Sequence, residues 1–266
     1  MLPAFRLCRP RVLAEALAAI SEERVPYCGG TELLLAMRAG LHRPEALVDL
    51  KGIAELTGVR VEDAAVVIGS TERHMDLAVH PIVREFLPML AEVEGRVGNA
   101  RVRAQGSIGG NLCFAEPKSD VATALVAYGA DVTLAGPDGH RTMPVEEFVA
   151  GPYFADKEPA ELLVDIHIPL PRNETRAVYL KYQVTERPTV GVALLHDRAG
   201  GRCRLVIGAV GEVQTLWTFG DPGEIEPETV CAELDPTPDL TGSERYKRHV
   251  AEVFVRRAMH ALGAAA

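Results

Sequence analysis

Two glycine-containing segments offer the clearest chemistry in this sequence. The first spans residues 27–34 (YCGGTELL), and the second spans residues 106–111 (GSIGGN). Glycine has no Cβ, so a Gly-Gly pair lets main-chain N–H groups come close to a ligand. Clusters of such N–H groups bind anions without help from lysine. Two clusters in one chain favour a ligand with a central pyrophosphate, and most dinucleotide ligands are redox cofactors.

Several common ligand and catalytic motifs are absent. No two glycines are separated by a single residue, which excludes the G-x-G-x-x-G fingerprint and disfavours an ordinary Rossmann site. The G-x-x-x-x-G-K-[ST] phosphate loop, the H-E-x-x-H motif and the G-x-S-x-G elbow are also missing. His74 and His80 stand near polar turns, where we expect surface or capping roles. Arg101 and Arg103 alternate on an expected strand, which favours a solvated face or a subunit contact.

The composition excludes some classes of partner. The chain has 266 residues, a hydrophobic fraction of 47% and a formal net charge of −9. This length allows two or three small domains or one large one, and the acidic charge argues against nucleic acid as a partner. The five cysteines lack C-x-x-C spacing, which argues against a metal site held by this chain and fits reduced thiols in a cytoplasmic protein. We expect no membrane span and no signal peptide.

The elements that position the two segments follow from hydrophobic periodicity. A small β-α-β-α-β unit is expected first, with strands at 3–7, 24–28 and 46–50 and helices at 11–21 and 31–38. The next part is expected to contain strands at 57–61, 65–69, 131–134 and 162–168, a helical stretch at 81–90 interrupted by Pro88, and a helix capped by Ser119 that ends at Gly129. The last part is expected to contain strands at 177–184, 189–195, 203–210 and 213–219 and a helix at 243–262. This order favours an α+β chain.

The glycine segments and their surroundings resemble one family. Residues 29–34, residues 101–111, and Pro117 with Ser119 and Asp120 are similar to the FAD-binding medium subunit of molybdenum hydroxylases. That family includes the flavoprotein subunits of aerobic carbon monoxide dehydrogenase and the flavin domain of xanthine dehydrogenase. The resemblance covers nearly the whole chain and continues through Arg141, Phe148, residues 161–163, residues 168–169, Lys181 and, less specifically, residues 243–248.

The resemblance implies a fold. It is an α+β, two-subdomain FAD-binding fold of the vanillyl-alcohol-oxidase/PCMH type, followed by a C-terminal domain of antiparallel sheet and helices. The expected divisions are an N-terminal FAD-binding subdomain (1–56), a second FAD-binding subdomain (57–172) and the C-terminal domain (173–266).

The resemblance also implies which residues bind FAD. One side of the pyrophosphate would be wrapped by Cys28, Gly29, Gly30, Thr31, Glu32 and Leu33. The other side, close to the flavin, would be formed by Ser107, Ile108, Gly109, Gly110 and Asn111. The remaining contacts implied are a hydrogen bond between Asp120 and the cofactor, contacts with the flavin end by Leu163 and Lys181, and an apolar contact by Val97. No catalytic residue and no metal ligand is implied.

Two of these assignments have rival interpretations, and two positions depart from the family. Asp120 could merely place a negative charge at the start of its helix. Lys181 could be a solvated strand lysine. Cys28 stands where alanine is common and Ala104 where asparagine is common. The cysteine-rich insertion that holds an additional iron–sulfur cluster in some members is absent, so none is expected here.

The resemblance implies an electron-transfer role in an oxidoreductase. A small subunit with two [2Fe-2S] clusters and a large molybdopterin subunit would be partners, typically as a dimer of heterotrimers. Electrons would leave FAD for an external acceptor such as a quinone, NAD or oxygen. One alternative is a self-sufficient FAD-dependent oxidoreductase, which would need a proton donor or acceptor on the open flavin face. Another is a scaffold that has lost its cofactor, against which the intact glycine pairs argue.

Overall fold

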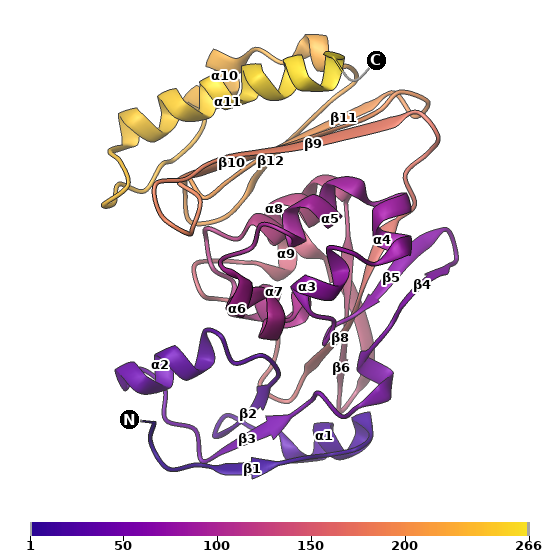
Figure 1. Ribbon diagram of the computed structural model, residues 1–266, viewed down its shortest axis with the longest axis vertical. Coiled ribbons are helices and arrows are strands. Elements are labelled where there is room, and N and C mark those ends of the chain that lie inside the picture. Colours follow the sequence, from indigo (N-terminus) through magenta and orange to yellow (C-terminus); the bar gives the residue numbers. More distant parts are fainter. Residues whose placement is uncertain (1, 265–266) are drawn as a thin grey trace.

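The computed structural model describes residues 2–264 of the chain. This part of the chain contains three β-sheets (Figure 1). The sheets follow one another along the long axis of the molecule in chain order, with the N-terminal sheet at one end and the C-terminal sheet at the other (Figure 1). We call the regions built on them the first, central and C-terminal lobes. Each sheet falls within one of the three expected segments, although the boundaries at residues 56 and 172 stay predictions. The fold is α+β, as predicted.

The first lobe is the expected β-α-β-α-β unit. Its parallel sheet has the order β1 (Arg6–Cys8), β3 (Ala46–Asp49), β2 (Arg24–Tyr27), and its helices are α1 (Leu13–Ala19) and α2 (Leu33–Ala39). Gly40 ends α2 in the left-handed conformation, with φ of 76°. A 3-10 turn, η1 (Ala54–Leu56), leads into the central lobe. Ala16 and Val48 share an apolar cluster with Leu162 and Val164 of the central lobe, so the two lobes pack through a common core.

The central lobe is an antiparallel sheet with helices packed beside it. The strand order is β4 (Val59–Glu62), β5 (Ala65–Gly69), β8 (Leu162–Pro169), β6 (Asp131–Gly136), β7 (Gly139–Pro144). The helices are α3 (His74–Leu77), α4 (Pro81–Phe86), α5 (Pro88–Glu94), α6 (Ala100–Gln105), α7 (Ile108–Phe114), α8 (Asp120–Tyr128) and α9 (Val145–Phe148). Pro88 separates α4 from α5 as expected. Ser119 caps α8, where its Oγ accepts from the Ala122 N–H at 3.1 Å.

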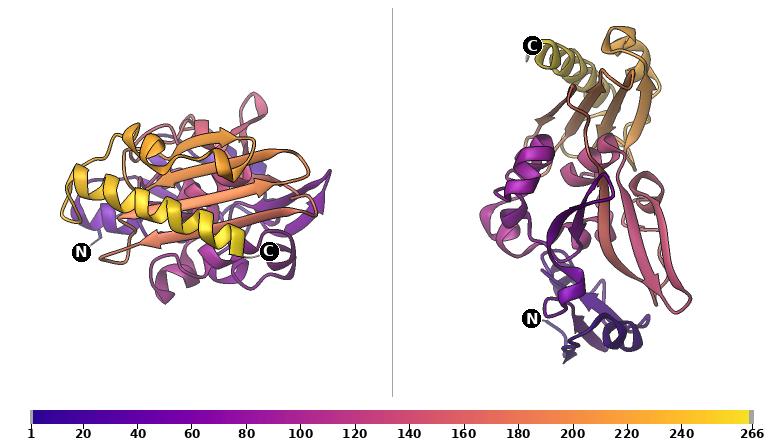
Figure 2. Two further views of the ribbon diagram at one scale, coloured as in Figure 1. Left: turned by 90° about the horizontal axis from the view of Figure 1, so that it is seen from above. Right: turned by 90° about the vertical axis from the view of Figure 1, so that its right-hand side faces the viewer.

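The C-terminal lobe is a four-stranded antiparallel meander between helices. The strand order is β12 (Thr215–Phe219), β11 (Arg202–Gly208), β10 (Val190–Asp197), β9 (Thr175–Tyr182), and the helices are η2 (Pro222–Glu224), α10 (Pro227–Ala232) and α11 (Glu244–Ala264). Along β10, Val192 and Leu194 pack in the cluster with α11, whereas Ala193 and Leu195 pack in the central cluster with α8. Helix α11 covers the outer face of this sheet, and α8 lies on the inner face (Figures 1 and 2).

Three local predictions need correction or addition. Arg101 and Arg103 lie on helix α6, not on a strand, because the Asn99 side chain caps that helix by accepting from Arg101 N–H at 3.0 Å. Residues 108–114 form helix α7, which was not among the helices expected from the sequence. Strand β7 was not predicted. Among the described residues, no helix is long and apolar enough to span a bilayer.

Candidate functional site

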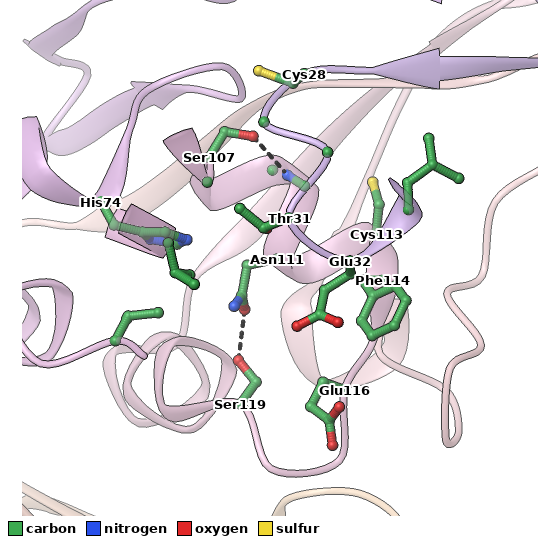
Figure 3. A pocket seen from close by; sticks show the side chains of 18 of the residues that line it. Cys28, Thr31, Glu32, His74, Ser107, Asn111, Cys113, Phe114, Glu116 and Ser119 are labelled. Atoms are coloured by element: carbon green, nitrogen blue, oxygen red, sulfur yellow. Dashed lines mark hydrogen bonds between the residues drawn. The ribbon is translucent and has the colours of Figure 1, made fainter. Parts of the chain in front are cut away.

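A cavity of about 480 Å³ opens between the first and central lobes, and a loop of the C-terminal lobe reaches its edge. The expected site residues at its wall are Cys28, Gly29, Gly30, Thr31, Glu32, Leu33, Val97, Ser107, Gly109, Gly110, Asn111, Asp120 and Leu163. Figure 3 shows side chains from both glycine segments around one space. Residues far apart in sequence are therefore brought together as predicted, while their contacts with a cofactor stay predictions.

The first glycine segment leaves main-chain donors free. Gly30 has φ of +66°, and a Cβ there would lie 2.5 Å from the Tyr27 ring, so only glycine fits. Within residues 2–264, the N–H groups of Gly30, Thr31 and Glu32 donate to no acceptor. The opposite side of the segment is anchored by Lys51, whose Nζ donates to the Cys28 carbonyl at 3.2 Å. This bend can therefore offer N–H groups to an anion in the cavity.

The second glycine segment uses its main-chain donors internally. Ile108 N–H donates to Glu72 O and Gly109 N–H to Ser70 O, both at 2.9 Å. Gly110 N–H donates to Ser107 Oγ at 3.2 Å, and Asn111 N–H to Ser107 O at 2.9 Å. The amides of residues 108–111 therefore begin helix α7 and tie it to the loop after β5, and contacts of these residues with FAD stay predictions.

Side chains are what the second segment presents to the cavity. Asn111 Oδ1 accepts from Ser119 Oγ at 2.6 Å, which fixes the amide and leaves its NH₂ as a donor (Figure 3). Ser107 Oγ also lies at the wall. Ile108, by contrast, is fully buried in the central core and does not line the cavity. A cofactor contact by Ile108 stays an untested prediction.

Asp120 and Lys181 form a buried ion pair. Lys181 Nζ donates to Asp120 Oδ2 at 2.8 Å and to the Arg96 carbonyl at 3.0 Å. The two side chains are 3% and 6% exposed, so the interpretation of Lys181 as a solvated lysine is wrong. Tyr179 OH donates to the other Asp120 oxygen, and burial together with that carboxylate raises the pKa of Tyr179 well above its usual value. Asp120 does stand in the first turn of α8 and also lines the cavity, so both interpretations of it remain.

Two further clusters at the cavity were not identified from the sequence. His74, expected at the surface, is buried, and its Nδ1 lies 2.5 Å from Oε2 of the fully buried Glu94. Arg187, on the loop between β9 and β10, pairs with Glu32 at 2.9 Å and with Glu116. No local pattern marks these pairs, because each joins residues distant in sequence.

The volume, the donors and the apolar residues of the cavity fit FAD. Its volume lies within the usual range of cofactor pockets, about 300–1,000 Å³. The free N–H groups of the first segment suit a diphosphate, and the apolar Val97 and Leu163 suit a flavin ring. FAD, when bound, would supply an electron carrier that exchanges electrons singly or in pairs. A cavity with these donors and apolar walls, between two lobes of an α+β fold, is suited to a dinucleotide cofactor such as FAD.

Comparisons with known proteins identify the family. Residues 3–171 match the family model described as the FAD binding domain in molybdopterin dehydrogenase, and the chain belongs to this family. Its cofactor is FAD, and it is the flavoprotein subunit of an oxidoreductase of the molybdenum hydroxylase group.

The similar proteins match over almost their whole length. The carbon monoxide dehydrogenase medium chain of Afipia carboxidovorans is 31% identical, with 97% of both chains covered. Caffeine dehydrogenase subunit beta of Pseudomonas sp. is 29% identical, with 96% of this chain and 94% of the other covered. A carbon monoxide dehydrogenase structure from Hydrogenophaga pseudoflava superposes with a TM-score of 0.92 at 29% identity, covering 99% of both chains.

Proposed function

We propose that this chain is the electron-transfer subunit of a molybdopterin-dependent hydroxylase or dehydrogenase. Its FAD would receive electrons from the [2Fe-2S] clusters of a small partner subunit and pass them to an external acceptor. A large molybdopterin subunit would oxidise the substrate, and a dimer of heterotrimers in the cytoplasm is the assembly we expect. The names of the relatives support this, since they are called medium chains and subunits.

One observation favours electron transfer over a self-sufficient oxidoreductase. Within residues 2–264, each charged side chain at the cavity wall is already held by another group. The pairs are Glu32 and Glu116 with Arg187, Asp120 with Lys181, Glu161 with Arg141, Glu186 with Asn99, Lys118 with Asp239, His74 with Glu94, and Lys157 with two carbonyl groups. Oxidation of a substrate at the flavin needs a base that can take the substrate's proton, and each carboxylate described at this wall already accepts a hydrogen bond. A flavin that only relays electrons needs binding, orientation and electrostatic tuning, which such a wall supplies.

The names of the relatives suggest that the substrate binds to another subunit. The relatives are named for carbon monoxide and caffeine, which differ in size and polarity, although each relative matches this chain over almost its whole length. Substrate choice in such a set would reside in another subunit.

The experiment is to load the full chain with FAD and test it alone and with its co-purifying subunits. Alone, it should oxidise a chemical reductant and reduce quinone, NAD or oxygen, yet turn over none of carbon monoxide, aldehydes or purines. Iron and molybdenum should appear only in the co-purified assembly. Rapid oxidation of a small substrate by the isolated chain would instead establish the self-sufficient enzyme.

A further inference from the structure

His74 and Glu94 form a buried pair in the wall of the FAD cavity. His74 begins α3 and Glu94 ends α5. Their side chains are 3% and 0% exposed, and Nδ1 lies 2.5 Å from Oε2. The main-chain N–H of His74 donates to the Gly106 carbonyl at 3.1 Å, so the pair is attached to the second glycine segment.

The surroundings of Glu94 indicate how the two side chains share a proton. Its second oxygen, Oε1, is sealed from solvent and has no hydrogen-bond partner among the described residues. Leu77 and Leu90, from the same two helices, belong to the apolar core. A buried carboxylate with one contact is costly unless an opposite charge lies beside it. One proton bridging Nδ1 and Oε2 avoids this cost, and with that proton on either atom the pair carries no net charge and Nε2 bears its own hydrogen.

The other ring nitrogen of His74 opens onto the cavity. Nε2 has no partner among residues 2–264, yet it is not among the atoms sealed from solvent, and His74 lines the cavity (Figure 3). A Cβ on Gly106 would lie 3.2 Å from this atom, so the missing side chain lets the ring lie against the segment. The pair therefore presents an Nε2–H donor to the cavity.

Such a donor meets a need at this point of the cavity. The amides of residues 108–111 are all used within the chain, and Gly29 packs against Gly106, so the two glycine segments meet beside His74. Arg187, Lys118 and Lys181 are neutralised by carboxylates. Lys157 is held by the carbonyls of Glu158 and Glu161. Apart from His74, the donors described at this part of the cavity include the first segment's N–H groups and the NH₂ group of Asn111.

We propose that His74 is a cofactor-binding residue, held by Glu94 so that its Nε2–H donates to a diphosphate oxygen of FAD. The inference rests on the proposed position of the diphosphate between the two glycine segments. Hydrogen bonds to charged groups contribute about 1.5–3 kcal/mol, which corresponds to roughly ten- to a hundredfold in affinity.

The test compares two substitutions of His74 in the full chain. Asn can still donate to Glu94 but has no atom at the Nε2 position, whereas Gln can place an uncharged donor there. Dissociation constants are measured for FAD, ADP and riboflavin. His196→Asn is the matched control, because His196 is a buried histidine near Asp221 that lies outside the cavity. His74→Asn should weaken FAD and ADP by about tenfold or more and leave riboflavin unchanged, and His74→Gln should lose less.

Two results of these titrations would overturn the proposal. One is unchanged FAD and ADP affinity in a folded His74→Asn variant, which would make the pair a core feature only. The other is weakened riboflavin with unchanged ADP, which would place His74 at the flavin ring. In both cases wild-type FAD binding and the electron-transfer role would be unaffected, so the two proposals fail separately.

A measurement on the wild-type chain avoids any folding defect of the variants. In ¹⁵N-histidine-labelled protein, Nε2 of His74 should carry a hydrogen, and its Nε2–H signal should shift when ADP is added. An Nε2 without a hydrogen, or an Nε2 signal that ADP leaves in place while the nucleotide binds, would refute the assignment.

Discussion

Gly29 and Gly106 lie main chain against main chain: a Cβ built on Gly29 would be 2.8 Å from the Gly106 Cα and closer still to the Gln105 carbonyl. The two glycine segments therefore touch, and at least one of their glycines serves the contact between lobes rather than a ligand directly. The width of the FAD cavity depends on this contact.

Gly29→Ala should force the lobes apart, because the atoms in the way are backbone and cannot rotate aside. We expect a loss of about 1–3 kcal/mol in the free energy of unfolding, the usual cost of overpacking, and weaker FAD binding. Denaturant unfolding and FAD titration measure the two effects. Gly263→Ala is the control, since nothing lies within 4 Å of its added methyl group. Wild-type stability and affinity in Gly29→Ala would show that the contact is not tight.

Periodicity and capping signals were enough to predict most of the fold. The helix over Asp120–Tyr128 was predicted with its cap at Ser119 and its end at Gly129, because all these signals are local. Strand β7 escaped because Gly139–Pro144 has few apolar residues and no alternation. Helix α7 escaped because Gly109 and Gly110 are poor helix formers, and contacts with Ser70 and Glu72 stabilise it instead.

The site residues also divide into those that the sequence could predict and those that it could not. The glycine segments were recognisable because their chemistry lies in consecutive residues. The pairs His74–Glu94 and Arg187–Glu116 were not, because only the folded chain brings their members together. The role expected of a histidine depends on whether it is buried. The sequence places His74 in a polar turn and does not show that α5 covers it.

Arg187→Gln should speed FAD release. Arg187 joins Glu32 of the first lobe to Glu116 of the central lobe across the cavity edge. Its side chain is 45% exposed, so the loss of stability should be within about 1 kcal/mol. Stopped-flow dissociation of FAD measures the effect, with Arg256→Gln, an exposed arginine paired with Glu228 and Glu252, as control. Equal release rates for the two variants would exclude a retaining role.

Lys181→Met should be strongly destabilising on its own. It leaves Asp120 buried without its cation, and breaking a buried pair on one side costs about 3–5 kcal/mol. Adding Asp120→Asn should recover part of this loss, because no charge then remains buried. A double-mutant cycle of unfolding free energies measures the coupling. Strictly additive losses would mean that the two side chains do not stabilise one another.

The alkaline limit of stability should depend on Tyr179. Burial and Asp120 raise the pKa of Tyr179 in the folded chain well above the ordinary tyrosine value of about 10, which we take for the unfolded chain. Below pH 10 both states keep the phenol proton, so its contribution to stability is complete. As pH rises past 10, the unfolded state loses the proton while the native state keeps it, and stability falls by up to about 1.4 kcal/mol per pH unit until the folded pKa is passed.

Tyr179→Phe removes that titration, so its stability should fall less steeply above pH 10 than that of the wild type. It should also lower stability at neutral pH, because Asp120 loses a donor. Urea unfolding at pH 8 to 11 measures both effects. Tyr153→Phe is the control: that residue is 57% exposed, and its smaller burial predicts a smaller change of slope. Parallel pH profiles of stability for the wild type and Tyr179→Phe would contradict the prediction. They would mean that Tyr179 has the same pKa in the folded and unfolded chain.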